Sequence, residues 1–195
     1  MMHIIFFSDV SSNPIHSIEP FTFINIQLQY VRIQYNHELQ ELCENAFALN
    51  TSFSVELWVA NNRNLVNIST GTFKNVTSGS NIYLDRNSLQ SIPSKAFQGE
   101  PIINMKLEDN NISFIHTDAF VALDSIYLLR LAYNNLKEIP ILHANITDTL
   151  DLSWNYLTAL GDWQLPSVKK IIINKNSIQR ISKTVFANIS SLEML

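Results

Sequence analysis

The sequence of 195 residues is poor in the residues from which most active sites and cross-links are built. It has a single cysteine, Cys43, which excludes an internal disulfide and a zinc cluster of thiolates. It has only four glycines, and neither G-x-G-x-x-G nor G-x-x-x-x-G-K-S/T occurs. The hydrolase motif G-x-S-x-G and the metal motif H-E-x-x-H are also absent. We therefore expect no catalytic residues, no bound metal and no cofactor.

Positive charge and long apolar runs are also scarce. The chain has 13 Lys and Arg against 17 Asp and Glu, and this net charge of -4 disfavours a nucleic-acid partner. No apolar run reaches the roughly 18 to 20 residues of a membrane-spanning helix, so we expect no membrane insertion by this segment. The apolar residues 1–7 lack the basic start and cleavage site of a signal peptide, and the chain is expected to be a fragment.

A repeat dominates what is present. The pattern Ile82-x-Leu84-x-x-Asn87-x-Leu89-x-x-Ile92 recurs four more times, with first residues Met105, Leu129, Leu150 and Ile171. Two earlier copies carry one extra residue after the asparagine, and they begin at Val31 and Leu57. An earlier unit should have its strand within residues 3–7, and Leu192-x-x-Leu195 should open another.

The closing residues of successive repeats are 21 to 26 residues apart: Ile18, Leu42, Ile68, Ile92, Ile115, Ile139, Leu160 and Ile181. Five residues after most of them stands a phenylalanine, and only Ala144 and Leu165 differ: Phe23, Phe47, Phe73, Phe97, Phe120 and Phe186. This pattern, L-x-x-L-x-L-x-x-N-x-L-x-x-I-P-x-x-x-F, resembles the typical leucine-rich repeat over nearly the whole chain.

The resemblance implies an α/β fold, a curved leucine-rich-repeat solenoid. Alternation in Leu-x-Leu points apolar side chains of a short strand to one face, and stacked repeats bury that face. We expect a parallel sheet on the concave side and loops, short helices or 3-10 turns on the convex side. The chain should form one domain, residues 1–195, of seven to eight repeats without terminal caps. Cys43 should be buried with the core, and an intermolecular disulfide is the alternative for a secreted chain with an odd number of cysteines.

Each repeat has an asparagine where the chain leaves the strand and turns. A buried amide has both donors and an acceptor for the backbone groups that the turn leaves unpaired. We therefore assign a structural ladder to these asparagines: Asn36, Asn62, Asn87, Asn110, Asn134, Asn155 and Asn176.

Residues between and after the apolar strand positions should point out of the concave sheet. Tyr, Trp and Arg are frequent anchors of protein interfaces, and we predict a partner-binding surface of Arg32, Trp58, Tyr83, Arg86, Lys106, Asp109, Arg130, Tyr133 and Trp154. The alternative is that aromatic residues are there for their strand propensity alone. Asp85 and Glu108 should be neighbours, and a solvated sheet face explains them better than an acid–base pair.

The sequence contains six Asn-x-Ser/Thr sequons, which favour secretion and N-glycosylation, at Asn50, Asn67, Asn75, Asn111, Asn145 and Asn188. None is in the predicted concave surface. The histidines fall at unrelated positions of the repeat, so we expect them at the surface rather than in a metal site.

With these sequons and the Phe position, the repeats resemble secreted or cell-surface insect proteins, such as mosquito immune leucine-rich-repeat proteins and Toll-type ectodomains. That resemblance implies extracellular protein binding in innate immunity or cell adhesion. The alternative is an intracellular scaffold or regulator, which the lone cysteine permits. We expect a protein partner, and pairing with a second copy of the chain is a further alternative.

Overall fold

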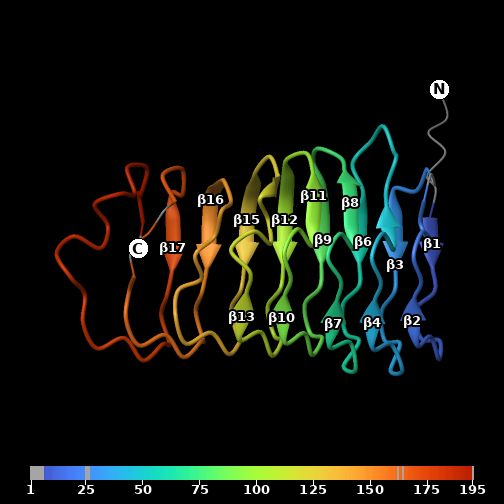
Figure 1. Ribbon diagram of the computed structural model, residues 1–195, viewed down its shortest axis with the longest axis horizontal. Helices are drawn as coiled ribbons and strands as arrows, with labels where there is room; N and C mark the ends of the chain where they lie inside the picture. The colour runs from blue at the N-terminus through green and yellow to red at the C-terminus, as the bar shows by residue number, and fades with distance from the viewer. Residues whose placement is uncertain (1–6, 25–26, 162, 164, 195) are drawn as a thin grey trace.

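The computed structural model describes residues 7–24, 27–161, 163 and 165–194. Its turns stack side by side, with the chain starting at one end of the stack and finishing at the other (Figure 1). A parallel sheet of eight strands, here the long sheet, runs along the whole stack. Its strands are β1 (Phe7–Asp9), β3 (Tyr30–Arg32), β6 (Glu56–Trp58), β9 (Ser80–Tyr83), β12 (Ile102–Lys106), β15 (Ile126–Arg130), β16 (Ile146–Asp151) and β17 (Lys170–Ile172). The fold is a leucine-rich-repeat solenoid.

The first strand runs past the residues that the sequence pattern indicated. β1 spans Phe7–Asp9 and pairs with β3 in the register Phe7–Tyr30 and Asp9–Arg32. Of the expected residues 3–7, Phe7 lies in this strand and 3–6 lie outside the described part. The backbone amide of Asn13 donates to Asn36 Oδ1 at 2.8 Å, in agreement with this register.

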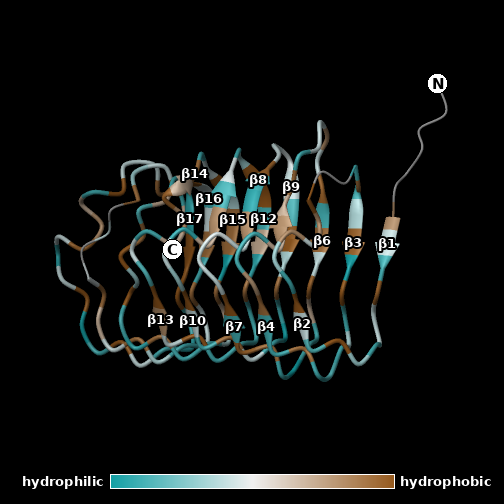
Figure 2. Cartoon of the chain, turned by 45° about the vertical axis from the view of Figure 1, so that its right-hand side comes forward, coloured by the Kyte–Doolittle hydropathy of each residue, from teal (hydrophilic) through white to brown (hydrophobic). Residues whose placement is uncertain are grey.

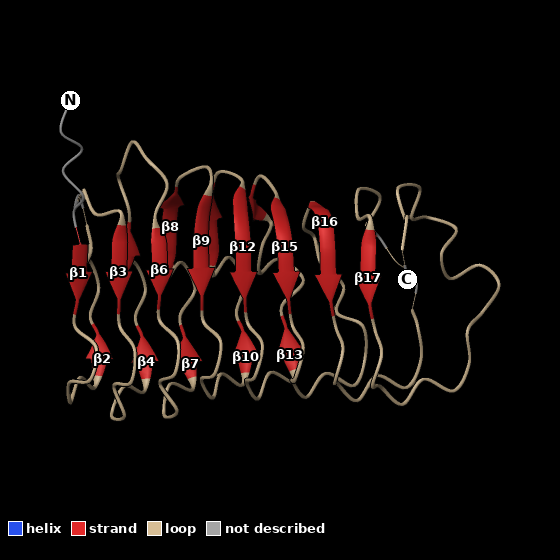
Figure 3. Ribbon diagram, turned by 180° about the vertical axis from the view of Figure 1, so that it is seen from behind, coloured by secondary structure: helices blue, strands red, loops and turns tan. Residues whose placement is uncertain are grey.

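Behind the long sheet lies a second parallel sheet of four strands, the back sheet. It consists of β5 (Phe47–Ala48), β8 (Phe73–Val76), β11 (Phe97–Gly99) and β14 (Ala122–Leu123). Two smaller sheets form a lower edge beneath the long sheet (Figure 3): β2 (Ser17–Ile18), β4 (Glu41–Leu42) and β7 (Asn67–Ile68), then β10 (Ser91–Ile92) and β13 (Phe114–Ile115). The described residues contain no helix, so short strands and turns take the convex side.

The core is a continuous column of apolar layers between these sheets, and hydrophobic and hydrophilic stretches alternate along each turn (Figure 2). Its largest members are stacked phenylalanine rings. Ring centroids lie 4.9 to 5.5 Å apart and adjacent planes differ by at most 15° along the series Phe23, Phe47, Phe73, Phe97 and Phe120. One repeat supplies one ring, so the spacing of the turns sets the spacing of the stack.

Proline explains why the lower edge is two sheets rather than one. In successive turns an amide donates to the carbonyl of the preceding turn: Ser69 N to Leu42 O at 3.0 Å and His116 N to Ile92 O at 2.9 Å. Pro93 and Pro140 occupy the same position and have no amide hydrogen. The sheet β2–β4–β7 accordingly ends before β10, and β10–β13 ends before the turn of Pro140.

The last turns differ from the earlier ones on the back. No back-sheet strand follows β14 in the described residues, and this is where Ala144 and Leu165 replace phenylalanine. Trp163, only 2% exposed, is buried in this part of the core. The part of the chain described contains no helix long and apolar enough to cross a membrane.

The expectation that Cys43 is buried was wrong. Its side chain is partly exposed, with Sγ 3.9 Å from Glu41 Oε1. Leu42, the preceding residue, is fully buried, so the alternation of the strand turns Cys43 away from the core. Partial burial, followed by the charge of Glu41, raises the pKa of the Cys43 thiol above its usual range.

Candidate functional site

The outward-pointing side of the long sheet, here the open face, presents columns of side chains that repeat from strand to strand. The pairing register of the strands aligns the central column as Asp9, Arg32, Trp58, Tyr83, Lys106, Arg130, Asp151 and Ile172. Trp58 lies directly beside Tyr83, so the extra residue in its repeat falls after the strand and does not disturb the column.

The sequence analysis missed one column of this face. Two residues before each central position, the register aligns Phe7, Tyr30, Glu56, Asn81, Asn104, Leu128, Thr149 and Lys170. Extending the strand alternation two residues upstream would have found them. Asn104 Nδ2 donates to Asn81 Oδ1 at 2.7 Å, which links β9 and β12.

The column beyond the strands consists of residues in left-handed backbone. Their φ values lie between 53° and 61°: Tyr35, Asn61, Arg86, Asp109, Tyr133, Trp154 and Lys175. This conformation costs about 1 kcal/mol or more for residues other than glycine and is best tolerated by Asn and Asp. Pairing between turns maintains it, since Tyr133 N donates to Ser153 O and Trp154 N to Asn174 O, both at 3.1 Å.

Two members of this column form the most exposed aromatic pair of the open face. Tyr133 and Trp154 stack with centroids 5.0 Å apart and planes 13° apart, yet each stays about half exposed, at 53% and 46%. Lys175 Nζ lies 5.5 Å from the Trp154 ring. The left-handed turn holds these side chains away from the sheet, so about half of each side chain remains accessible to solvent.

The aromatic residues of the central column are packed against one another instead. Trp58 and Tyr83 stack at 3.9 Å, Trp58 Nε1 donates to Glu56 Oε2 at 3.0 Å, and Lys106 Nζ lies 5.0 Å from the Tyr83 ring. Tyr83 is consequently only 8% exposed. Burial, followed by the nearby charge of Glu56, raises the pKa of Tyr83. Of the predicted binding residues, Tyr83 is the least accessible to a partner.

The remaining predicted residues are cationic or acidic and flank these aromatic groups. Arg32 is exposed, with its guanidinium 5.3 Å from the Phe7 ring. Asp109 lies between two arginines, with Oδ2 3.5 Å from Arg63 and 3.9 Å from Arg86. Arg130 is partly exposed. At such exposure these ion pairs contribute little to stability, so the charges remain available to a partner.

Asp85 and Glu108 are neighbours on the open face, but they are not simply solvated. Glu108 Oε2 is buried, with no hydrogen-bond partner in the described part of the chain. Burial, followed by repulsion from Asp85, raises the pKa of the Glu108 carboxyl. The small side chains of Ala60 and Ala132 occupy the same column on either side and are buried at 1% and 7% exposure. The expectation of a solvated pair therefore fails for Glu108.

The ladder asparagines lie behind the open face, under the turn. In each, Oδ1 accepts a backbone amide of the preceding turn; Nδ2 donates to carbonyls of its own and the preceding turn in all but Asn36, where it donates to Gln34 O of its own turn. Asn110 Oδ1, for example, accepts from Leu89 N at 3.0 Å, and its Nδ2 donates to Leu84 O at 2.9 Å and Leu107 O at 3.1 Å. Asn176 is partly exposed, unlike the other six. Asn13 belongs to the same series, because Asn13-x-Ile15-x-x-Ile18 fits the template.

A rim above the open face carries two further apolar side chains that sequence analysis missed. The register shifts by one residue between β9 and β12, and again between β15 and β16. Such bulges re-aim side chains. Ile103 and Tyr127, at the shifted positions, are 44% and 47% exposed and line a shallow groove with Pro101 and Ser125.

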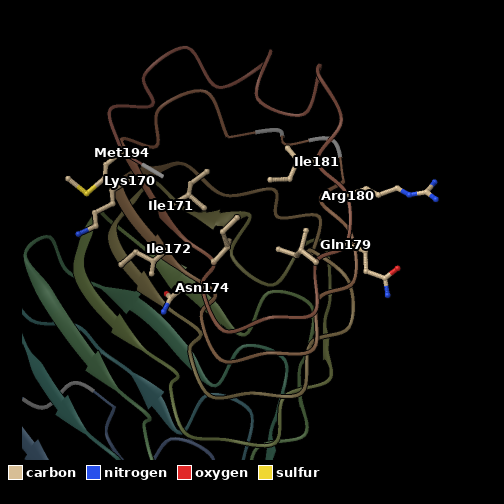
Figure 4. A pocket seen from close by; sticks show the side chains of 10 residues that line it. Lys170, Ile171, Ile172, Asn174, Gln179, Arg180, Ile181 and Met194 are labelled. Carbon is tan, nitrogen blue, oxygen red and sulfur yellow. The ribbon is translucent and has the colours of Figure 1, made fainter.

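An open, largely apolar pocket lies at the last turn. It encloses about 670 Å³, and its walls include Ile171, Ile173, Ile178 and Ile181, with Met194 beside it (Figure 4). These residues continue the core columns of earlier turns, so the pocket is the uncovered last layer of the stack. The described residues hold no group of three metal-ligating side chains. The four described histidines are at least partly exposed, and His16 and His143 pair with Glu38 and Asp118.

Comparison with known proteins agrees with this geometry. Residues 80–136 match the family model described as leucine rich repeat. The chain is 25% identical over 161 residues to human leucine-rich repeats and immunoglobulin-like domains protein 1 and 27% identical over 139 residues to chicken Tsukushi. It is 29% identical over 105 residues to rat osteomodulin. These alignments cover 67%, 66% and 52% of this chain, but only 15%, 36% and 24% of the relatives. They support a leucine-rich-repeat protein.

Proposed function

Because the chain folds as a leucine-rich-repeat solenoid, we propose that it is a non-catalytic module that binds a protein partner outside the cell through the open face of the long sheet. The stacked, half-exposed pair Tyr133 and Trp154 carries this proposal. Aromatic side chains of this kind, beside a cation such as Lys175, are frequent anchors of protein interfaces.

Strand propensity does not explain this pair. β15 ends at Arg130 and β16 at Asp151, so Tyr133 and Trp154 both lie beyond their strands. Their left-handed backbone disfavours bulky side chains, and neither ring contributes to the buried core. Tyr133 and Trp154 raise the energy of their left-handed turns and are not needed to fill the core, so contact with a partner explains them better.

The residues around this pair are suited to a partner of mixed charge. Arg86, Arg130, Lys106 and Asp109 lie on the same face, and pairs of opposite charge at the edge of an interface favour orientation and association rate more than affinity. The extracellular assignment draws on the exposed sequons and on the resemblance to secreted and cell-surface repeat proteins. The same resemblance favours a role in innate immunity or cell adhesion.

The experiment uses the chain displayed as a pentamer against an array of recombinant ectodomains and secreted proteins. For each protein that binds, affinity is then measured for the double variant Tyr133→Ser/Trp154→Ser. We expect at least about a 30-fold loss, since one interface anchor is worth about 2 kcal/mol or more. Thermal unfolding of the variant should stay close to that of the wild type, because both side chains are half exposed.

The matched control is Phe114→Ser. Phe114 is equally apolar and 59% exposed, but it lies on β13 in the lower edge, away from the open face. This variant should bind as the wild type does. If Phe114→Ser abolished binding and Tyr133→Ser/Trp154→Ser retained it, the binding site would lie on the lower edge. Failure of every protein on the array to bind would count against extracellular recognition.

A further inference from the structure

The six sequon asparagines share a structural setting that separates them from the other asparagines of the chain. All six side chains are exposed: Asn50, Asn67, Asn75, Asn111, Asn145 and Asn188. In each sequon no proline follows the asparagine, and the Ser or Thr two residues later is at least partly exposed. Both residues of the acceptor motif therefore reach the surface of the folded chain.

The middle residue of each sequon explains this arrangement. It is buried in every case, at 9% exposure or less: Thr51, Ile68, Val76, Ile112, Ile146 and Ile189. In extended chain, neighbours on either side of a residue point the opposite way. A buried middle residue thus turns the asparagine and the Ser or Thr outward together.

The ladder asparagines have the opposite setting. Asn36, Asn62, Asn87, Asn134 and Asn155 are at most 5% exposed, and their side-chain amides make hydrogen bonds between turns. In the turns without the extra residue, the position two residues after the asparagine is a core Leu or Ile. A Ser or Thr there would put a hydroxyl into the core, so these turns exclude a sequon at the ladder.

The sequons also avoid the open face. Asn67 lies on β7 of the lower edge and Asn75 on β8 of the back sheet. Asn145 directly precedes β16, and Asn50 follows β5 by two residues. No sequon asparagine is in the register columns that define the open face. A bulky polar group on each of them would leave the columns of that face uncovered.

We propose that these six asparagines are N-glycosylation sites and that their glycans cover the back and the edges of the solenoid. In this modification the side-chain Nδ2 forms a bond to the anomeric carbon of a sugar. A lipid-linked oligosaccharide pyrophosphate is the donor, the lipid pyrophosphate leaves, and the amide gives up one proton. The proposal rests on the extracellular part of the proposed function, since this donor is met in the secretory pathway.

The test is expression of the full chain behind an added secretory leader in cells that glycosylate proteins. Peptide N-glycosidase converts each glycosylated asparagine to aspartate, which peptide mass spectrometry in heavy-oxygen water locates. We expect conversion at the six sequon asparagines and none at the buried Asn87 and Asn134. Absence of conversion at all six in secreted, folded protein would overturn the proposal, and conversion at Asn87 or Asn134 would overturn the structural distinction.

A matched pair of variants tests one site without touching its asparagine. Ser113 is exposed, so Ser113→Ala and Ser113→Thr should both fold. Ser113→Ala should lose the glycan of Asn111, whereas Ser113→Thr should keep it; equal occupancy in the two variants would contradict a sequon-directed site. Enzymatically deglycosylated protein on the ectodomain array separates the two proposals. The proposed partner binding depends on the open face and not on the glycans, so the deglycosylated protein should bind its partner as the glycosylated protein does.

Discussion

The turns up to Leu123 and the turns after it share a front but differ behind. Both carry the long sheet, the left-handed turn residue and the ladder asparagine. In the part of the chain that the structure describes, only the earlier turns have the back sheet and the stacked phenylalanines. The spacing of the closing residues falls to 21 in the later turns. The comparison shows that the front of each repeat is independent of what covers its back.

The largest effect should come from the phenylalanine stack, the feature that most separates the two regions. Phe97 is fully buried between Phe73 and Phe120. Phe97→Ala should lower the free energy of unfolding by about 3 to 5 kcal/mol, because it opens a cavity between two rings. Phe186→Ala is the control in the later region, where the side chain is only partly buried, and should cost roughly half as much. Urea denaturation measures both, and equal losses would contradict the difference between the regions.

A smaller effect should come from the ladder, which the two regions share. Asn110→Ala removes the acceptor of Leu89 N and the donor to two carbonyls in the core, and we expect a loss of about 3 kcal/mol. Asn176 makes the same bonds in a partly exposed position, where water can replace them, so Asn176→Ala should cost about 1 kcal/mol. Thermal unfolding checks both, and an unchanged Tm for Asn110→Ala would remove the ladder as a source of stability.

The smallest effect should come from Glu108. In its column of the open face the earlier turns have the carboxylates Asp85 and Glu108, whereas the later turns have Ala132 and Ser153. The folded pKa of Glu108 is raised, first by burial and then by Asp85. The wild type should therefore lose stability as the pH rises from the pKa of Glu108 in the unfolded chain through its pKa in the folded chain. Below that range Glu108 should cause no loss of stability. Glu108→Gln should raise Tm at neutral pH and leave it unchanged in acid.

The control for Glu108 is Glu138→Gln, an exposed carboxylate on the lower edge of the later region. Surface substitutions of this kind change stability by about 0.5 kcal/mol or less, and this variant keeps Glu108, so its Tm should follow that of the wild type at every pH. If Glu108→Gln and Glu138→Gln give the same Tm profile, the buried carboxylate does not limit stability on the open face.

The fold could be predicted from the sequence because its rules are local and repeat. Leu-x-Leu alternation sets the inner face of each strand, and the asparagine three residues after it marks the turn. The expectation for the first strand left out Ser8 and Asp9, since Ser8 stands where other repeats have a large apolar residue. Asn13 would have corrected it. On the convex side, where loops, short helices or 3-10 turns were expected, the described residues form turns and short strands, and pairing between turns satisfies the backbone there.

The sequence by itself determined the repeat, its register, and the central and left-handed columns of the open face. Only the tertiary structure decided which of those residues a partner can reach. Tyr83 and Tyr133 belong to neighbouring columns with the same side chain, yet one is packed beneath Trp58 and Lys106 and the other is half exposed. The physical reason is that each outcome depends on contacts between turns more than 20 residues apart in sequence. No local pattern encodes those contacts.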